Sequence, residues 1–295
     1  MKYNILPITS VILLTVGLSS CSDSPVEPDT NIPDGKIAME FSFSHPEQSR
    51  ATETSFENGD VVGLYVSEAD KVLEISGNTV NNESLSYSGS SWSPSRPLYW
   101  NAGAYNVYAY YPRLDDVTSI TDLPFEVKTD QRAVPSGMDG YEASDFLFAS
   151  AKGVQASANR VNLQFRHIMS KMSIRLIKGE DFEGEMPETA TVYIHNTVTE
   201  ASVDLMAGVA TKATRGTRNT ITARQEGPTT YSAVIVPQRI ENRMPLIEVV
   251  MNGVSFLYES KFLFKPGIHH IVNLVVDKNP EQVKIDIGGE INNWN

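Results

Sequence analysis

The sequence has little of what most enzymes and nucleic-acid-binding proteins need. Its 295 residues include one Cys and five His, so neither an intrachain disulfide nor a thiolate metal cluster can form. Lys and Arg number 24 against 36 Asp and Glu, which gives a formal net charge of −12. Nucleic-acid binding requires clustered basic residues that neutralise phosphates. The acidic balance therefore argues against a nucleic-acid partner.

Motifs with a defined chemistry are also missing: there is no H-E-x-x-H, P-loop, G-x-S-x-G or EF-hand loop. His269 and His270 are adjacent in an expected strand, where alternation sends their rings to opposite faces and prevents joint chelation. His167 is near Ser170 and Lys171, but catalysis needs a third group that holds base and nucleophile together. We interpret His167 as structural. The sequence predicts no enzyme and no catalytic, cofactor-binding or metal-binding residue.

The N-terminal residues have the pattern of an export signal. Lys2 precedes an apolar stretch, Ile5 to Leu18, that is too short and too interrupted to span a bilayer. It runs into Leu18-Ser19-Ser20-Cys21, which resembles the bacterial lipobox, with Cys21 as the residue that becomes lipid-modified. The alternative is an ordinary signal peptide followed by a chance Cys. We expect residues 1–20 to be a lipoprotein signal peptide.

The next residues, 21–35, are rich in Pro, Asp and Ser and are expected to form a flexible tether. Structure is expected to start at a strand in which every second residue is apolar, with Ile37, Met39, Phe41 and Phe43 on one face. Similar strands are expected at Val61–Val66, Tyr105–Tyr111, Asp145–Ala149, Val161–Phe165, Met172–Ile177, Thr191–Ile194, Tyr231–Val236, Leu246–Met251, Phe256–Phe264, Ile271–Val276 and Val283–Ile287.

Turn-forming groups separate these strands, and Asn252-Gly253 is a typical short-hairpin signal. No run of four turns shows apolar residues at helical spacing. This pattern predicts an all-β protein built from antiparallel β-sandwiches. We place the boundary between two domains in the Gly/Ala/Ser-rich stretch 152–159, which gives an N-terminal sandwich, 36–155, and a C-terminal sandwich, 156–295.

Several segments, taken in order, resemble one known family. They are the lipobox, Phe56-x-x-Gly59-Asp60-x-x-Gly63-Leu64-Tyr65, Leu98-Tyr99-Trp100, Tyr105 to Pro112, Ser144-Asp145-Phe146-Leu147, Leu163-x-Phe165-x-His167-x-Met169-Ser170-Lys171, Val236-Pro237-Gln238, Phe264-x-Pro266-Gly267 and Ile291-x-x-Trp294. The chain is similar to the fimbrillins, lipoprotein precursors that build type V pili in Bacteroidales. The resemblance implies two β-sandwich domains of transthyretin-like topology.

The resemblance also implies a maturation step. In this family an arginine-specific surface protease cuts the N-terminal domain, which removes the lipid and the first strand and opens a groove for another subunit's strand. Here Arg50-Ala51 follows the first expected strand, so cleavage there would release Ile37, Met39, Phe41 and Phe43. The alternative is an ordinary loop arginine. Rival cut sites are Arg132-Ala133, Arg215-Gly216 and Arg218-Asn219, none of which would release the lipid with just the first strand.

The candidate donor strand is the alternating segment with Val283, Ile285 and Ile287 on one face, near the C-terminus. It fits equally well as an ordinary last strand of the second domain.

The sequence leaves three functions open. The first is a stalk or tip subunit of a fimbria that supports adhesion: an outer-membrane lipoprotein precursor at the cell surface that matures and polymerises with other fimbrial subunits. The second is a monomeric outer-membrane lipoprotein that binds glycan through aromatic side chains, such as the tyrosines of Tyr105–Tyr111, although such a stripe is more often core. The third is a glycan hydrolase with carboxylates from distant strands.

Overall fold

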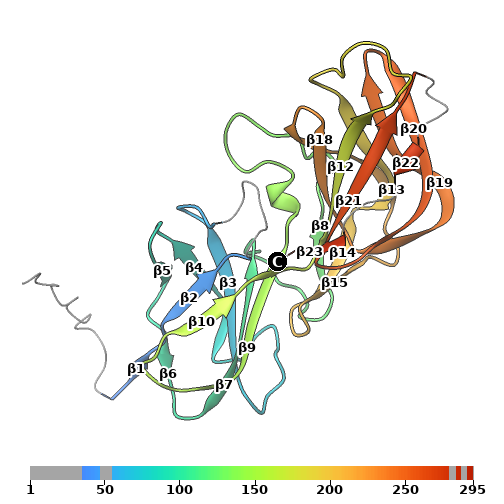
Figure 1. Cartoon of the computed structure of the whole chain (residues 1–295). Coiled ribbons are helices and arrows are strands. Elements are labelled where there is room, and N and C mark those ends of the chain that lie inside the picture. Colours follow the sequence, from blue (N-terminus) through green and yellow to red (C-terminus); the bar gives the residue numbers. More distant parts are fainter. Residues whose placement is uncertain (1–34, 47–54, 279–283, 287–290, 295) are drawn as a thin grey trace, which may run out of the picture. The chain divides into compact units, whose positions relative to one another are not determined.

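The computed structural model describes residues 35–46, 55–278, 284–286 and 291–294 (Figure 1). The chain divides into two units, residues 1–35 and 36–295, and the second unit holds the fold. Within the described residues its regular elements are strands and one short 3₁₀ helix, η1 (Glu142–Ser144), so the predicted all-β class is confirmed. None of the described residues belongs to a helix long and apolar enough to cross a membrane. Cys21, Arg50, Ala51, Val283 and Ile287 lie outside the described residues.

A six-stranded antiparallel sheet forms one side of the first core, in the order β11-β9-β7-β3-β4-β5. The strands are β3 (Val61–Glu68), β4 (Val80–Tyr87), β5 (Trp92–Pro94), β7 (Ala104–Tyr111), β9 (Leu147–Gln155) and β11 (Arg166–His167). Facing it are two short ladders, made by β1 (Ile37–Ala38) with β6 (Tyr99–Trp100), and by β2 (Phe41–Ser44) with β10 (Val161–Gln164). Side chains from both sides fill one hydrophobic cluster, the first core.

The second core lies between a six-stranded and a four-stranded sheet. This six-stranded sheet consists of β17 (Arg224–Gly227), β18 (Thr230–Ile235), β12 (Ser170–Lys178), β21 (Ile268–Val276), β22 (Lys284–Asp286) and β23 (Ile291–Asn293), with β22 and β23 both paired with β21. The four-stranded sheet consists of β16 (Arg218–Thr222), β13 (Thr191–Val198), β19 (Gln238–Met251) and β20 (Val254–Phe264). A three-stranded sheet of β15 (Val209–Lys212), β14 (Glu200–Asp204) and β8 (Leu123–Glu126) adds to the same core.

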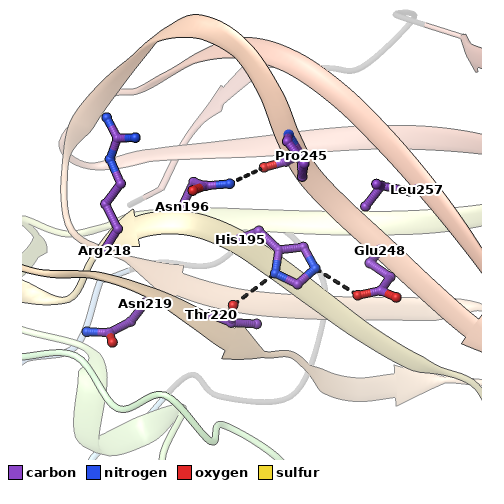
Figure 2. A pocket seen from close by; sticks show the side chains of 8 residues that line it. All are labelled: His195, Asn196, Arg218, Asn219, Thr220, Pro245, Glu248 and Leu257. Carbon is purple, nitrogen blue, oxygen red and sulfur yellow. Dashed lines mark hydrogen bonds and ion pairs between the residues drawn. The ribbon is translucent and has the colours of Figure 1, made fainter.

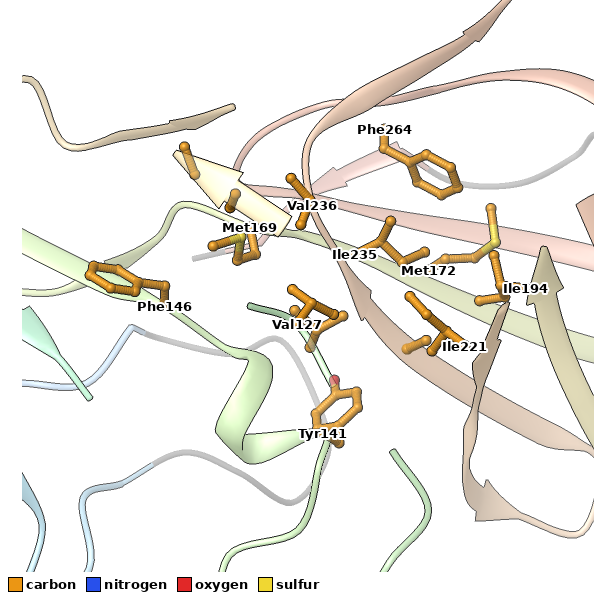
Figure 3. Close-up of a cluster of buried hydrophobic side chains, with 14 of the residues drawn as sticks. Val127, Tyr141, Phe146, Met169, Met172, Ile194, Ile221, Ile235, Val236 and Phe264 are labelled. Atoms are coloured by element: carbon orange, nitrogen blue, oxygen red, sulfur yellow. The ribbon is translucent and has the colours of Figure 1, made fainter. Parts of the chain in front are cut away.

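Figure 3 shows part of the second core. Met172 and Ile235 come from the six-stranded sheet of this core and Ile194 and Ile221 from the four-stranded one, and all four are fully buried. This burial of aliphatic side chains from facing sheets is what holds a β-sandwich together.

Two ladders differ from the antiparallel prediction. β10 runs parallel to β2, and β21 runs parallel to β12. Alternation of side chains is the same in parallel and antiparallel strands, so the sequence pattern could not distinguish the two pairings.

The boundary predicted at 152–159 also needs correction. Strand β10 was expected to open the second domain, but it pairs with β2, and Val161 and Leu163 are buried in the first core. Conversely, β8 precedes that boundary yet pairs with β14 and places Leu123 in the second core. The chain crosses between the cores more than once, so no single cut at 152–159 separates them.

The predicted hairpin at Asn252-Gly253 is confirmed. Met251 pairs with Val254 across the turn, and the two turn residues have φ values of 51° and 76°. Positive φ at both central positions is the geometry that the Asn-Gly pair favours in a two-residue hairpin.

Candidate functional site

The first expected strand packs into the first core, but it is divided into two short strands, β1 and β2. We call the position that β2 fills in this core its seat. β1 and β2 are separate, with Met39 N–H donating to Leu98 O at 2.9 Å between them. Met39, Phe41 and Phe43 are 5%, 6% and 9% exposed, as the alternation predicts. Ile37 was expected on the same face but is 38% exposed, because it belongs to β1, which pairs with β6 instead of β10. The buried set from this segment is therefore three side chains.

Aromatic rings surround the two phenylalanines of β2. The Phe41 ring lies 6.2 Å from Trp100, and the Phe43 ring lies 5.1 Å from Trp92 and 5.6 Å from Phe165. Aromatic pairs at such centroid distances add to the free energy gained from burial. The seat of β2 is thus lined by aromatic side chains from other parts of the chain.

The strand is held along one edge. Phe41 pairs with Val161 and Phe43 with Leu163 on β10, and Ser42 Oγ donates to Asn162 Oδ1 on the same ladder. A groove of about 210 Å³ beside the strand is lined by residues that include Met39, Phe41, Trp92 and Pro94. Among the described strands β10 is the only ladder partner of β2, and the two form a two-stranded sheet of their own.

The candidate donor strand has only its centre within the described residues. Ile285 belongs to β22 and pairs with Leu274 of β21, at the edge of the six-stranded sheet of the second core of its own chain. Further along, Trp294 is 3% exposed and its backbone N–H donates to Gly267 O at 2.9 Å.

His167 is held by neighbours that are not the Ser and Lys beside it in the sequence. Its Nδ1 lies 2.8 Å from Asp145 Oδ2, and its ring stacks on Trp294 with a centroid distance of 3.9 Å. Ser170 Oγ donates to Ile268 O at 3.5 Å, while Lys171 Nζ lies 3.2 Å from Glu226 Oε1. These contacts do not bring the three side chains together as base and nucleophile.

The two adjacent histidines of β21 point to opposite faces of their sheet, as expected. His270 packs against Phe264 in the sandwich, and burial lowers its pKa to about 4. His269 Nε2 lies 2.7 Å from Ser173 Oγ, and burial, followed by Lys171, lowers its pKa to about 3. Both rings are neutral near pH 7.

The tyrosines of β7 do not form an exposed platform for sugars. Tyr105, Tyr108 and Tyr110 are at most 4% exposed and belong to the hydrophobic clusters. The more common interpretation of such a stripe, a core strand, is the one that the structure shows.

The sequence reasoning missed a polar depression on the four-stranded sheet (Figure 2). His195 lies at its centre, with Nδ1 2.9 Å from Thr220 Oγ1 and Nε2 2.9 Å from Glu248 Oε2. The pKa of Glu248 is lowered by the hydrogen bond that Ser255 donates and then by His195. The three strands concerned are far apart in sequence, so no local motif could indicate this site.

The comparisons with known proteins agree with the fold. The fimbrillin-like family model matches residues 49–294. The chain therefore belongs to the fimbrillin-like family, which confirms the resemblance found in the sequence.

Two curated relatives come from Bacteroides. The chain is 25% identical over 192 residues to the "Putative fimbrium tip subunit Fim1C" of Bacteroides ovatus, a match that covers 60% of this chain but only 35% of that protein. It is 22% identical over 302 residues to the "Putative fimbrium subunit Fim1C" of Bacteroides uniformis, with 96% of this chain and 93% of that protein covered.

A solved structure shares the fold. The "putative cell adhesion protein" from Bacteroides uniformis superimposes with a TM-score of 0.68 at 20% identity, covering 89% of this chain and 99% of that one.

Proposed function

We propose that the chain is a structural subunit, stalk or tip, of a cell-surface fimbria, and that it assembles with other fimbrial subunits to support adhesion. Family membership and the relatives named as fimbrium subunits support this role. The observation that carries the mechanism is the seat of β2: an N-terminal strand fills an aromatic pocket and is held by one ladder. A strand from a neighbouring subunit replaces it in the assembled fimbria.

The energetics suit such an exchange. Burial of Met39, Phe41 and Phe43 contributes about 1.5–3 kcal/mol each, or about 4.5–9 kcal/mol together, as an upper estimate. That sum is comparable with the whole stability of a domain. An emptied seat also leaves the edge of β10 unpaired, and unpaired edges bind added strands.

Maturation is assigned to the bond between Arg50 and Ala51. Arg50 follows the end of β2 at Ser44 in the sequence, so a cut after it separates β1 and β2 from the rest of the chain. Cuts after Arg132, Arg215 or Arg218 leave β2 joined to β10 or divide the cores themselves. Before the cut, the lipid on Cys21 anchors the precursor to the outer membrane.

The donor is assigned to the segment with Val283, Ile285 and Ile287. Its central strand β22 lies at a sheet edge, where fewer ladder bonds must break than in a central strand. Its alternating apolar side chains match the alternation of the seat.

The test is treatment of the purified precursor with an arginine-specific protease, followed by N-terminal sequencing and a non-denaturing gel. Wild-type protein is expected to give a new N-terminus at Ala51 and a ladder of oligomers, whereas Arg50→Ala gives neither. While the bond is intact, the tethered strand competes at a millimolar effective concentration for a short flexible link.

Arg132→Ala is the matched control, because Arg132 is also followed by Ala and its side chain is 65% exposed. This variant should be processed and should polymerise like the wild type. Polymerisation of Arg50→Ala into the same ladder would overturn the strand-replacement mechanism. In a separate assay, Cys21→Ala should not incorporate labelled fatty acid, and incorporation would contradict the lipobox assignment.

A further inference from the structure

The polar depression on the four-stranded sheet shares no lining residue with the groove beside β2. It has a volume of about 560 Å³, and its lining residues come from all four strands of the sheet (Figure 2). A continuous row of hydrogen bonds crosses its floor, from Thr220 through His195 and Glu248 to Ser255, with successive distances of 2.9, 2.9 and 2.6 Å. Each strand thus contributes one side chain to a fixed polar surface.

A β-bulge shapes the depression. The pairing of β13 with β16 shifts register between Ile194 and Thr197, and Asn196 in this bulge has a φ of 61°. Its Nδ2 donates to Pro245 O at 2.8 Å, which fixes the amide and leaves its Oδ1 as an acceptor. Bulges re-aim side chains in this way next to binding sites.

The acidic and the basic residue that line the depression, Glu248 and Arg218, differ in how many polar partners they have. Glu248 accepts hydrogen bonds from Ser255 and His195, so its carboxylate is already satisfied. Arg218 is exposed, and its guanidinium contacts Met244, with Nη1 3.7 Å from Sδ. In the described part of the chain no carboxylate lies within ion-pair distance of Arg218. A guanidinium of this kind can form a bidentate pair with a carboxylate of a ligand.

We propose that this depression binds a sugar that carries a carboxylate, such as a uronic or sialic acid residue. Arg218 pairs with the sugar carboxylate, while the amide of Asn196 and the hydroxyl of Thr220 contact its hydroxyl groups. Pro245 and Leu257 provide the small apolar surface that the C–H face of a pyranose ring requires. A specific protein partner normally covers about 800 Å² on each side, so a small polar depression fits a sugar better.

The experiment titrates the full chain with methyl glycosides and follows binding by calorimetry. Methyl β-glucuronide and the methyl glycoside of N-acetylneuraminic acid are the probes, and methyl β-glucoside is the neutral comparison. We expect at least one acidic probe to bind about tenfold more tightly than the neutral one, because a charge-assisted pair is lost in the latter.

Arg218→Ala is expected to remove that preference, and Arg218→Lys to restore part of it, since the charge remains while the bidentate geometry is lost. Arg239→Ala is the matched control: Arg239 is an exposed arginine on β19 of the same sheet that does not line the depression. Thermal unfolding checks that the variants fold.

Equal binding of acidic and neutral probes, no binding of either acidic probe, or an unchanged preference in a folded Arg218→Ala variant would each overturn the proposal. Fimbrial assembly of the same variants, tested separately, is expected to be unaffected.

Discussion

The two cores of this chain are completed in different ways. In the first, Phe41 and Phe43 come from an N-terminal strand attached by a single parallel ladder. In the second, the central strand β12 is paired on both sides, with β18 and β21, and Ile174 lies fully buried in its middle. We therefore expect that the first core can lose its terminal strand while the second core stays folded, whereas β12 cannot leave without breaking two ladders.

The difference between the two cores is tested most directly by removing the N-terminal strand. A chain that begins at Ala51 lacks up to about 4.5–9 kcal/mol of side-chain burial in the first core. We expect the amides of β10 to lose most of their hydrogen-exchange protection while those of β12 keep it. Exchange measured by mass spectrometry on the full and shortened chains tests this. Equal protection of β10 in both would show that the first core does not depend on β2.

Two substitutions, one in each core, test the same difference between the cores. Phe43→Ala should lower the free energy of unfolding of the full chain by about 3–5 kcal/mol, and Ile174→Ala by about 2–5 kcal/mol. After cleavage at Arg50 and release of the fragment, only Ile174→Ala should still have an effect. Urea unfolding before and after protease treatment measures both. If Phe43→Ala still changes the cleaved product, the fragment has not left its seat.

An effect of comparable size is expected at Gln131, whose buried side chain bonds to both backbone groups of Val234 on β18. Its Oε1 accepts from Val234 N–H and its Nε2 donates to Val234 O, both at 2.8 Å. Gln131→Ala leaves two buried backbone groups unpaired, which costs about 1–3 kcal/mol for each group. The neighbouring Arg132→Ala serves as control, with an expected change below about 0.5 kcal/mol. Similar urea midpoints for the two variants would contradict this role.

The smallest effect concerns mild acid. Burial lowers the pKa of His270 to about 4, so between pH 6.5 and 4 the unfolded chain binds the proton more readily than the folded one. Stability should therefore be greatest above pH 6.5 and should fall as the pH decreases through this window. His270→Gln keeps an acceptor for Lys265 N–H without titrating, and should make the plot of unfolding midpoint against pH less steep, while the part of the fall that comes from His269, whose pKa is lowered to about 3, remains. An unchanged plot would exclude His270 as the source.

The sequence predicted the strands that carry a clear alternation and missed those that do not. Val161–Phe165 and Met172–Ile177 were found because their apolar residues recur at every second position, at Val161, Leu163 and Phe165 in the first of them. Strand β4, Val80–Tyr87, was missed because it carries Asn81, Asn82 and Glu83 in succession. Its pairing with β3 compensates for this polar composition, and such tertiary pairing is not visible in a single sequence.

The candidate sites were predictable to different degrees. The seat of β2 followed from the alternation of Met39, Phe41 and Phe43, but the exposure of Ile37 depended on which strand β1 pairs with. The depression around His195 could not be predicted at all. It requires Thr220 and Glu248 to meet His195 across three strands, and the bulge at Asn196 has no signal beyond a residue type that tolerates positive φ.

The alternation of side chains along β2 has a consequence for the spacing between subunits in the proposed fimbria. A replacement strand displaced by one residue would turn its apolar side chains toward solvent, while a displacement by two would return them to the pocket. Two residues of a strand span about 6.7 Å. In the proposed assembly, the spacing between consecutive subunits can therefore change only in increments of this size, and β10, through Val161 and Leu163, selects which increment is occupied.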